Sequence, residues 1–116
     1  MCELRFVGRV SGRSIAMPVQ CVREGKQLVI YVGHSSGKRW WRNFIGSHDV
    51  LVHVGGANHQ GQGRVVDVGH LDRVWAEQTY RGRYPRVELL AIDPMVVIDL
   101  AARTTDEISR DGLEGE

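Results

Sequence analysis

The first stretch that could bind a ligand lies at residues 8–13 and reads Gly-Arg-Val-Ser-Gly-Arg. Arg9 and Arg13 each carry a planar guanidinium that can donate paired hydrogen bonds to a phosphate, and the hydroxyl of Ser11 can donate another. Gly12 gives the backbone freedom to turn between them. The stretch therefore predicts an anion-binding turn, and a basic hairpin turn without a ligand is the alternative.

A second candidate spans residues 33–44 and reads Gly-His-Ser-Ser-Gly-Lys-Arg-Trp-Trp-Arg-Asn-Phe. Its glycines and serines suit a backbone that turns sharply and exposes N–H groups, and Ser36 is predicted to cap a short helix. Lys38 and Arg42 would share one face of that helix. The stretch is not a nucleotide-binding P-loop, because only three residues separate its glycines and Arg39 replaces the Mg²⁺-binding Ser or Thr.

Two adjacent tryptophans, Trp40 and Trp41, follow in the same predicted helix. Neighbours on a helix point in different directions, so we expect one of them to pack against the protein core. The other would then be available to a flat ring. Cations, exposed N–H groups and an indole together suit a ligand with an anionic end and a ring.

Few other side chains suggest chemistry. His34 could hydrogen-bond a ligand or be an ordinary loop residue, and Tyr80 and Tyr84 could lie over a ligand or at the edge of the core. The five histidines form no i, i+4 pair and no cysteine stands at ligand spacing, so no metal site is predicted. No nucleophile, general base or carboxylate pair stands out, so no catalytic residue is predicted and any chemistry would fall to a cofactor.

The elements that must position these residues are mainly strands. Apolar periodicity predicts six β-strands, at residues 4–10, 15–22, 27–33, 49–55, 62–68 and 95–100. Helical spacing predicts one short helix within residues 33–44, a longer one at 71–80 and another short one at 86–92, before the last strand. Hairpin turns between most strands favour a small six-stranded antiparallel β-barrel, with a sandwich as the alternative.

Two strand details can be tested. Ile15, Met17, Val19 and Cys21 alternate and should point to one face. Pro18 cannot donate to a ladder, so the second strand should lie at an edge of the sheet or carry a bulge. The polar, glycine-containing residues 56–61 are predicted to form a long hairpin tip.

Length and charge suggest one domain with a tail. The chain has 116 residues, 42% hydrophobic and 25% charged, which fits one globular domain at residues 1–102. Residues 103–116 carry two basic and five acidic side chains, or −3, so the net charge of +1 leaves +4 on the domain. We expect a disordered acidic tail and a mildly basic domain that favours anionic ligands, with nucleic acid unsupported by so small a charge.

The compartment is predicted from what the sequence lacks. Two cysteines without a disulfide framework and an N-terminus without an apolar signal core predict a cytoplasmic protein. No apolar run approaches the ~20 residues of a membrane helix, so we expect no membrane association.

Taken in order, these motifs resemble the deazaflavin-dependent nitroreductase family, part of the split β-barrel flavin-binding superfamily that includes the pyridoxamine-phosphate oxidases. The resemblance covers roughly residues 4–100. It depends on Gly8-Arg9-x-Ser11-Gly12, Pro18, the strand at 28–33, Trp40-Trp41-x-Asn43, and the strands at 50–54 and 63–68.

The resemblance implies a homodimer of split β-barrels that binds coenzyme F-420, an 8-hydroxy-5-deazaflavin with a phosphate-bearing tail. Reduced coenzyme would pass a hydride to an electron-poor nitro compound, quinone or enone. By position, the residues near the coenzyme would be Arg9, Ser11, Gly12, Arg13, Pro18, Tyr31, Val32, Gly33, His34, Ser35, Lys38, Trp40, Trp41 and Asn43. Tyr80 and Tyr84 would lie near the substrate.

Within this resemblance the turn at residues 8–13 would hold the phosphate, residues 31–35 would run beside the ring or its tail, and the tryptophan helix would cover it. Family members commonly carry basic residues where this chain has Val10, Ile15 and His34. We expect Lys38 and Arg42 to replace that charge.

Two other functions remain open at this stage. The same fold could bind FMN as an oxidoreductase or carrier. A small basic barrel could also bind a nucleotide or oligonucleotide without catalysis and use Trp40 and Trp41 as stacking platforms.

Overall fold

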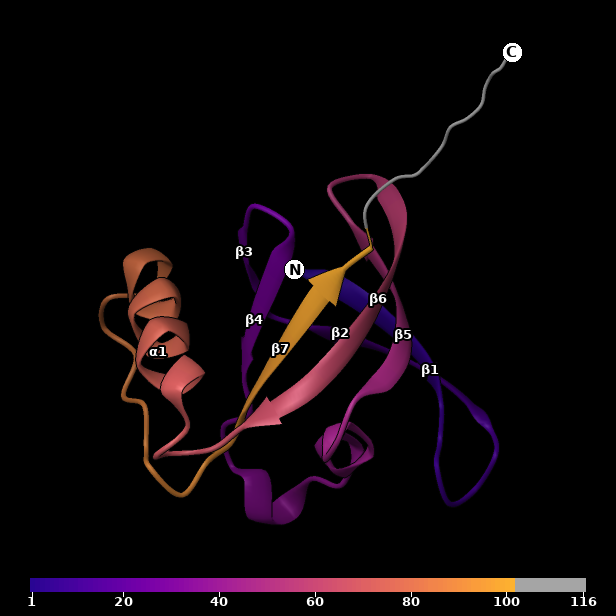
Figure 1. The fold of residues 1–116 in the computed structure, drawn as a ribbon, viewed down its shortest axis with the longest axis horizontal. Helices are drawn as coiled ribbons and strands as arrows, with labels where there is room; N and C mark the ends of the chain where they lie inside the picture. The colour runs from indigo at the N-terminus through magenta and orange to yellow at the C-terminus, as the bar shows by residue number, and fades with distance from the viewer. Residues whose placement is uncertain (102–116) are drawn as a thin grey trace.

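Seven strands form one antiparallel sheet in this computed structural model, which describes residues 1–101 (Figure 1). The strands are β1 (Cys2–Val7), β2 (Ser14–Val19), β3 (Val22–Glu24), β4 (Gln27–Tyr31), β5 (His48–Val54), β6 (Ala57–Val66) and β7 (Met95–Leu100). Their order in the sheet is β2-β1-β5-β6-β7-β4-β3. The mainly β, antiparallel class is confirmed, but the strands number seven rather than six. The predicted acidic tail at residues 103–116 lies outside the described residues.

The extra strand arises where the sheet curls on itself. β2 and β3 are the two edges of the sheet, yet only Gln20 and Cys21 separate them in the chain. The sheet must therefore curl until its edges meet at this short crossing. The predicted strand at 15–22 is split because its partner changes: β2 pairs with β1, whereas β3 pairs with β4. Cys21 and Val22 keep the alternation, pointing into the inner and the outer core respectively.

The inner core fills the curl of the sheet. It includes Leu4, Val52 and Ile98, which are fully buried and come from three different strands. The prediction for the second strand is confirmed, because Val19 and Cys21 belong to this core and Ile15 and Met17 pack against it. The expected place of Pro18 is also confirmed, since β2 is an edge strand that pairs with β1 alone within residues 1–101.

The hairpin between β5 and β6 is tighter than predicted. Gly55 and Gly56 form a two-residue turn with φ of 60° and 79°, and Val54 pairs directly with Ala57. Both turn residues need positive φ, which glycine adopts without strain and which suits the right-handed twist of a hairpin. The predicted long tip at residues 56–61 is therefore wrong, because these residues, apart from Gly56, already belong to β6.

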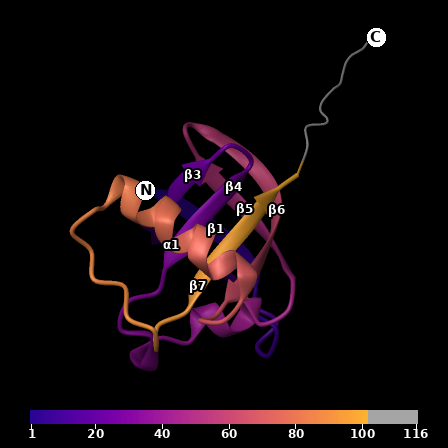
Figure 2. The same cartoon turned by 60° about the vertical axis from the view of Figure 1, so that its left-hand side comes forward.

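The helix α1 (Leu71–Arg83) covers the outer face of the sheet over β3, β4 and β7 (Figure 2). The imidazole of His70 caps it, accepting a hydrogen bond from the amide of Asp72 at 3.0 Å. The helix extends three residues beyond the predicted 71–80. Its buried face and the outer sides of the strands form an outer core, which includes Val29, Ala76 and Val97.

The helix predicted at residues 86–92 is absent, and this segment is a loop. Val87 and Leu89 alternate toward the outer core, a spacing of two that a helix cannot provide. The backbone of Leu90 is instead bound by side chains: its N–H donates to the Tyr31 hydroxyl and its carbonyl accepts from Arg73. No helix within the described chain has the length and apolar character needed to cross a bilayer.

Residues 33–44 form two short 3₁₀ turns, η1 (Ser35–Gly37) and η2 (Trp40–Phe44), rather than one helix. They lie below the barrel in Figure 1. Lys38 interrupts them with an extended backbone (φ −124°, ψ 145°), so Lys38 and Arg42 do not share a helix face as predicted. Ser36 lies inside η1, and His34 occupies the cap position that was predicted for Ser36.

Candidate functional site

The turn at residues 8–13 is closed by its own backbone. The amide of Gly8 donates to the Arg13 carbonyl and the amide of Gly12 donates to the Gly8 carbonyl, both at 2.9 Å. The Ser11 hydroxyl accepts from the Arg13 amide at 3.2 Å, and Gly12 has a φ of 70°, a value that favours glycine. The turn is thus a defined loop that leaves the side chain of Arg13 exposed.

The two stretches singled out in the sequence meet through Arg9 and Asn43. The amide of Arg9 donates to Asn43 Oδ1 at 2.8 Å, and Nε of Arg9 donates to the Asn43 carbonyl at 2.7 Å. Nη2 of Arg9 donates to the Ser47 carbonyl. The guanidinium of Arg9 therefore fixes the turn against the end of η2, with Nη1 left for other partners. Arg13 forms no ion pair or side-chain hydrogen bond within residues 1–101 and is the more available cation.

Both tryptophans pack against the inner core, which differs from the prediction that one would point away. Trp40 and Trp41 are each half-buried. Nε1 of Trp41 donates to the Lys38 carbonyl at 3.0 Å, and Arg42 lies 5.7 Å from the centroid of the Trp41 ring. A 3₁₀ turn lying across the end of a barrel can place successive side chains against it, whereas the prediction assumed an α-helix with one buried face.

Phe44 anchors η2. Its side chain is fully buried, and its ring meets those of Trp40 at 6.1 Å and Phe6 at 5.0 Å, both edge to face. Gly63 of β6 makes room for it, because a Cβ at Gly63 would stand 2.6 Å from Cδ1 of Phe44. This close approach fixes the segment at residues 40–44 at the end of the barrel.

A buried carboxylate that the sequence analysis did not identify holds the loop at residues 33–35. Asp93, only 3% exposed, accepts from the Tyr31 hydroxyl at 2.6 Å and from Ser35 Oγ at 2.7 Å. The Ser35 amide donates to it as well, at 3.1 Å. These bonds, that of Tyr31 foremost, lower the pKa of Asp93 against the opposing effect of burial. A single acid within the apolar run before β7, directly followed by Pro94, is the signal that could have revealed it.

The loop that Asp93 anchors has an unusual backbone at its tip. His34 has a φ of 56° and a ψ of 43°, the left-handed region that a non-glycine residue rarely enters. Its side chain is exposed beside buried Ser35. Gly33 precedes it half-buried, and Val32 points into the inner core. Of the residues predicted to run beside the coenzyme, His34 is therefore the most accessible.

Three tyrosines gather between α1 and the sheet. The ring centroids of Tyr31 and Tyr80 lie 6.0 Å apart, and those of Tyr80 and Tyr84 lie 5.2 Å apart. Tyr80 is buried, and its hydroxyl accepts a hydrogen bond from Gln20 at 3.2 Å. Burial raises the pKa of both Tyr31 and Tyr80. Tyr80 thus occupies a core position. Of the two tyrosines expected near the substrate, only the half-buried Tyr84 has a side chain that a substrate could contact.

A second buried charge stabilises the same region. Arg73 is 3% exposed, and its Nε donates to Glu77 at 2.8 Å. Its terminal nitrogens donate to the carbonyls of Val66 at 3.0 Å and Leu90 at 3.3 Å. Arg73 therefore ties α1 to β6 and to the loop before β7, a structural role that the helical spacing alone did not predict.

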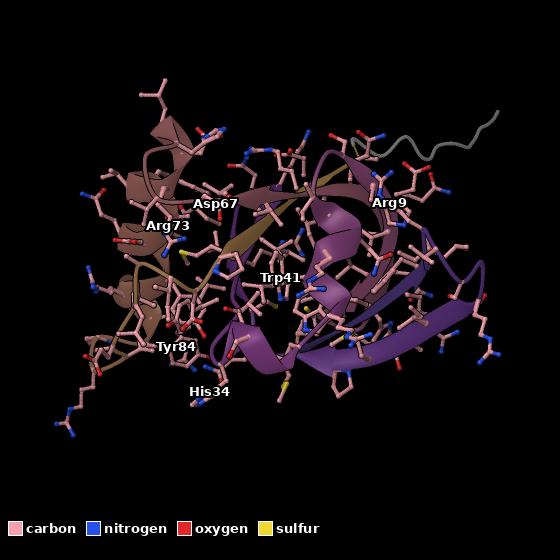
Figure 3. The ribbon with its side chains drawn as sticks, turned by 90° about the horizontal axis from the view of Figure 1, so that it is seen from below. Arg9, His34, Trp41, Asp67, Arg73 and Tyr84 are labelled. Carbon is pink, nitrogen blue, oxygen red and sulfur yellow. The ribbon has the colours of Figure 1, made fainter. Side chains whose placement is uncertain are left out.

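The predicted site residues fall into two groups. In Figure 3, Arg9 and Tyr84 lie on opposite sides of the molecule, with Trp41 between them and His34 at the lower edge. The turn at 8–13 and η2 form one group, and the tyrosines with Asp93 form the other. Residues 33–39 connect the two groups, with Ser35 bonded to Asp93 at one end and η2 beginning at the other. Pro18 is exposed on β2, where it pairs with Glu3.

A hollow of about 770 Å³ lies elsewhere, on the outer face of β1, β5, β6 and β7. Its lining includes Arg5, Asp49, Gln62 and Asp99. None of the predicted site residues lines it. The residues that the sequence suggested for ligand binding therefore lie outside this hollow.

No model of a known protein family matches the chain, and no curated protein matches it significantly.

Proposed function

We propose that this protein is a deazaflavin-dependent oxidoreductase of the nitroreductase type, acting with coenzyme F-420 on an electron-poor small molecule. One observation carries the proposal. The turn Gly-Arg-x-Ser-Gly and the segment Trp-Trp-x-Asn, which carry the resemblance, touch each other through the hydrogen bonds of Arg9 with Asn43, 34 residues apart. Two motifs that meet at one end of a barrel can form a single ligand site.

The residues at this end fit a phosphate-bearing coenzyme. Arg13, Lys38, Arg39 and Arg42 are exposed, and they supply cations for the anionic tail. The bound coenzyme would supply the hydride, which accords with the absence of a predicted acid–base pair. The protein would bind and orient the ring beside half-buried Trp40 and Trp41, and His34 would offer its imidazole from the adjoining loop.

The geometry refines the role of Arg9. Since its Nε and Nη2 already bind carbonyls, Arg9 would chiefly position the turn, and Arg13 with Lys38 would contact the phosphate. A homodimer, expected from the resemblance, is part of the proposal. Size-exclusion chromatography with light scattering would measure its mass.

Titrations of the full-length protein would test the proposal against its two alternatives. Tryptophan fluorescence would follow additions of coenzyme F-420, FMN and a single-stranded oligonucleotide in separate experiments. We expect saturable quenching by coenzyme F-420. Quenching by FMN alone would favour the flavin alternative. Binding of the oligonucleotide with a steep salt dependence, and of neither coenzyme F-420 nor FMN, would favour the non-catalytic barrel.

Variants would locate the site. Arg13→Ala and Lys38→Ala should each weaken coenzyme binding by about 1.5 to 3 kcal/mol, the range for a hydrogen bond to a charged group. Lys26→Ala is the matched control, because Lys26 is also an exposed cation but lies in the turn before β4, at the other end of that strand from residues 33–44. If all three variants bound the coenzyme as tightly as the wild-type protein, the coenzyme would bind at another place in the molecule. That result would reject this site without rejecting coenzyme binding itself.

A further inference from the structure

The two cysteines come together where the curled sheet closes. Cys2 begins β1, and Cys21 lies in the crossing between β2 and β3. Cys2 pairs with Val19 in the register of β1 and β2, so Cys21, two residues further along, is its diagonal neighbour on the same face. Both side chains point into the inner core and are 5% and 9% exposed.

The thiols interact directly. The interaction between the two side chains lowers the pKa of Cys21 to about 7, against the opposing effect of burial, and raises the pKa of Cys2. The positive charges of the N-terminal amine and of Arg23 further lower the pKa of Cys21. The lowered pKa favours Cys21 as the attacking cysteine and leaves Cys2, its neighbour in the inner core, as the resolving cysteine.

We propose that Cys2 and Cys21 form a redox modification site, at which a small peroxide converts the two thiols into a reversible intramolecular disulfide. The Cys21 thiolate attacks one oxygen of hydrogen peroxide, the O–O bond breaks, and a sulfenic acid and hydroxide form. The sulfur of Cys2 then attacks the sulfenic sulfur and loses its proton, and the S–O bond breaks to release water. The hydroxide takes up the proton that Cys21 lost on ionisation and becomes the second water. Overall, two thiols are oxidised to a disulfide and one hydrogen peroxide is reduced to two waters.

Burial selects the oxidant by size. Thiols exposed by less than a tenth admit hydrogen peroxide more readily than a bulky disulfide or alkylating agent. The absence of a third cysteine from the chain favours an internal bond over mixed pairings. The same two sulfurs would return to thiols when a dithiol reductant attacks the bond.

The disulfide would form where the two edges of the sheet, β2 and β3, come together. It would join the first residue of β1 to the crossing that links the two sheet edges, closing a loop over residues 2–21. Closing such a loop restricts the unfolded chain, so the oxidised form should melt at a higher temperature. Gln20, next to Cys21, holds the Tyr80 hydroxyl, so the bond would form beside the tyrosine cluster. None of this requires the coenzyme.

Intact-mass spectrometry of the reduced, full-length protein would test the proposal. After hydrogen peroxide treatment and unfolding in N-ethylmaleimide, we expect a monomer lighter by two hydrogens that takes no maleimide, and two maleimides after dithiothreitol. Its melting temperature should exceed that of the reduced form. Cys2→Ser and Cys21→Ser should each lose both the mass change and the rise in melting temperature. If either variant fails to fold, tryptic mapping of the oxidised wild-type protein should still show the peptides of Cys2 and Cys21 joined. Unreacted thiols, sulfinic acids or only intermolecular dimers would overturn the proposal.

Discussion

Replacing Asp93 with alanine should destabilise the fold more than any change at an exposed acid. The substitution removes the acceptor of three hydrogen bonds, from the Tyr31 hydroxyl, the Ser35 hydroxyl and the Ser35 amide. Those three bonds tie the loop after β4 to the residue before Pro94. The half-buried Tyr31 hydroxyl and the buried donors of Ser35 would lose this partner unless the loop opens to water.

The magnitude follows from the bonds. A hydrogen bond to a charged group contributes about 1.5 to 3 kcal/mol, but bonds that share one acceptor do not add fully. We therefore expect Asp93→Ala to lower the free energy of unfolding by about 3 kcal/mol, or the melting temperature by about 10 to 20 °C. Asp93→Asn keeps the shape and one oxygen acceptor, so about 1 to 2 kcal/mol should be lost.

The effect should depend on pH in one direction. The pKa of Asp93 is lowered in the folded protein, so its ionised form stabilises the fold at pH values above the unfolded pKa of about 3.9. That contribution disappears as the pH falls from this value through the folded pKa. The stability difference between wild type and Asp93→Asn should be largest near neutral pH and shrink below about pH 4.

Urea unfolding, followed by tryptophan fluorescence at several pH values, would measure both effects. Asp49→Ala is the matched control: Asp49 is exposed and accepts a bond from Gln62 at 3.1 Å. Its replacement should cost no more than about 0.5 kcal/mol. If Asp93→Ala lost no more stability than this control, the bonds of Asp93 with Tyr31 and Ser35 would not be what stabilises the loop.

Two further substitutions test how the end of the barrel is held. Gly63→Ala would place a Cβ against the buried ring of Phe44, so we expect the free energy of unfolding in urea to fall by about 2 to 3 kcal/mol. Gly37→Ala is the control, because open space surrounds its Cβ, and it should change stability little. Equal effects of the two substitutions would contradict the packing of Phe44 against Gly63. Asn43→Ala removes the acceptor for the Arg9 amide, and calorimetry should show a loss of about 1 kcal/mol. An unchanged melting temperature would mean that the turn does not depend on this bond.

The sequence by itself determined the class of the fold and the faces of its strands. Alternation is a local property, so Ile15, Met17 and Val19 could be assigned to one side before any partner was known. The missing N–H of Pro18 likewise predicts an edge strand from one residue's chemistry. The longer helix was predicted because its apolar spacing repeats over several turns.

Only the tertiary structure decided which residues meet and which are buried. The strand at 15–22 splits because β2 pairs with β1 and β3 pairs with β4, a change of partner that no local pattern predicts. Residues 86–92 form a loop because Arg73 and Tyr31 bind the backbone of Leu90.

The candidate site shows the same division. Residue types marked Arg9 and Arg13 as possible phosphate ligands, yet only the fold showed that Arg9 directs its guanidinium donors to the carbonyls of Asn43 and Ser47. The sequence did not predict the role of Asp93, because a carboxylate can be buried there only with hydrogen-bond donors that lie about 60 residues away along the chain. Spacing along the chain predicts which face a side chain takes, whereas the partners that satisfy it are determined when distant segments pack together.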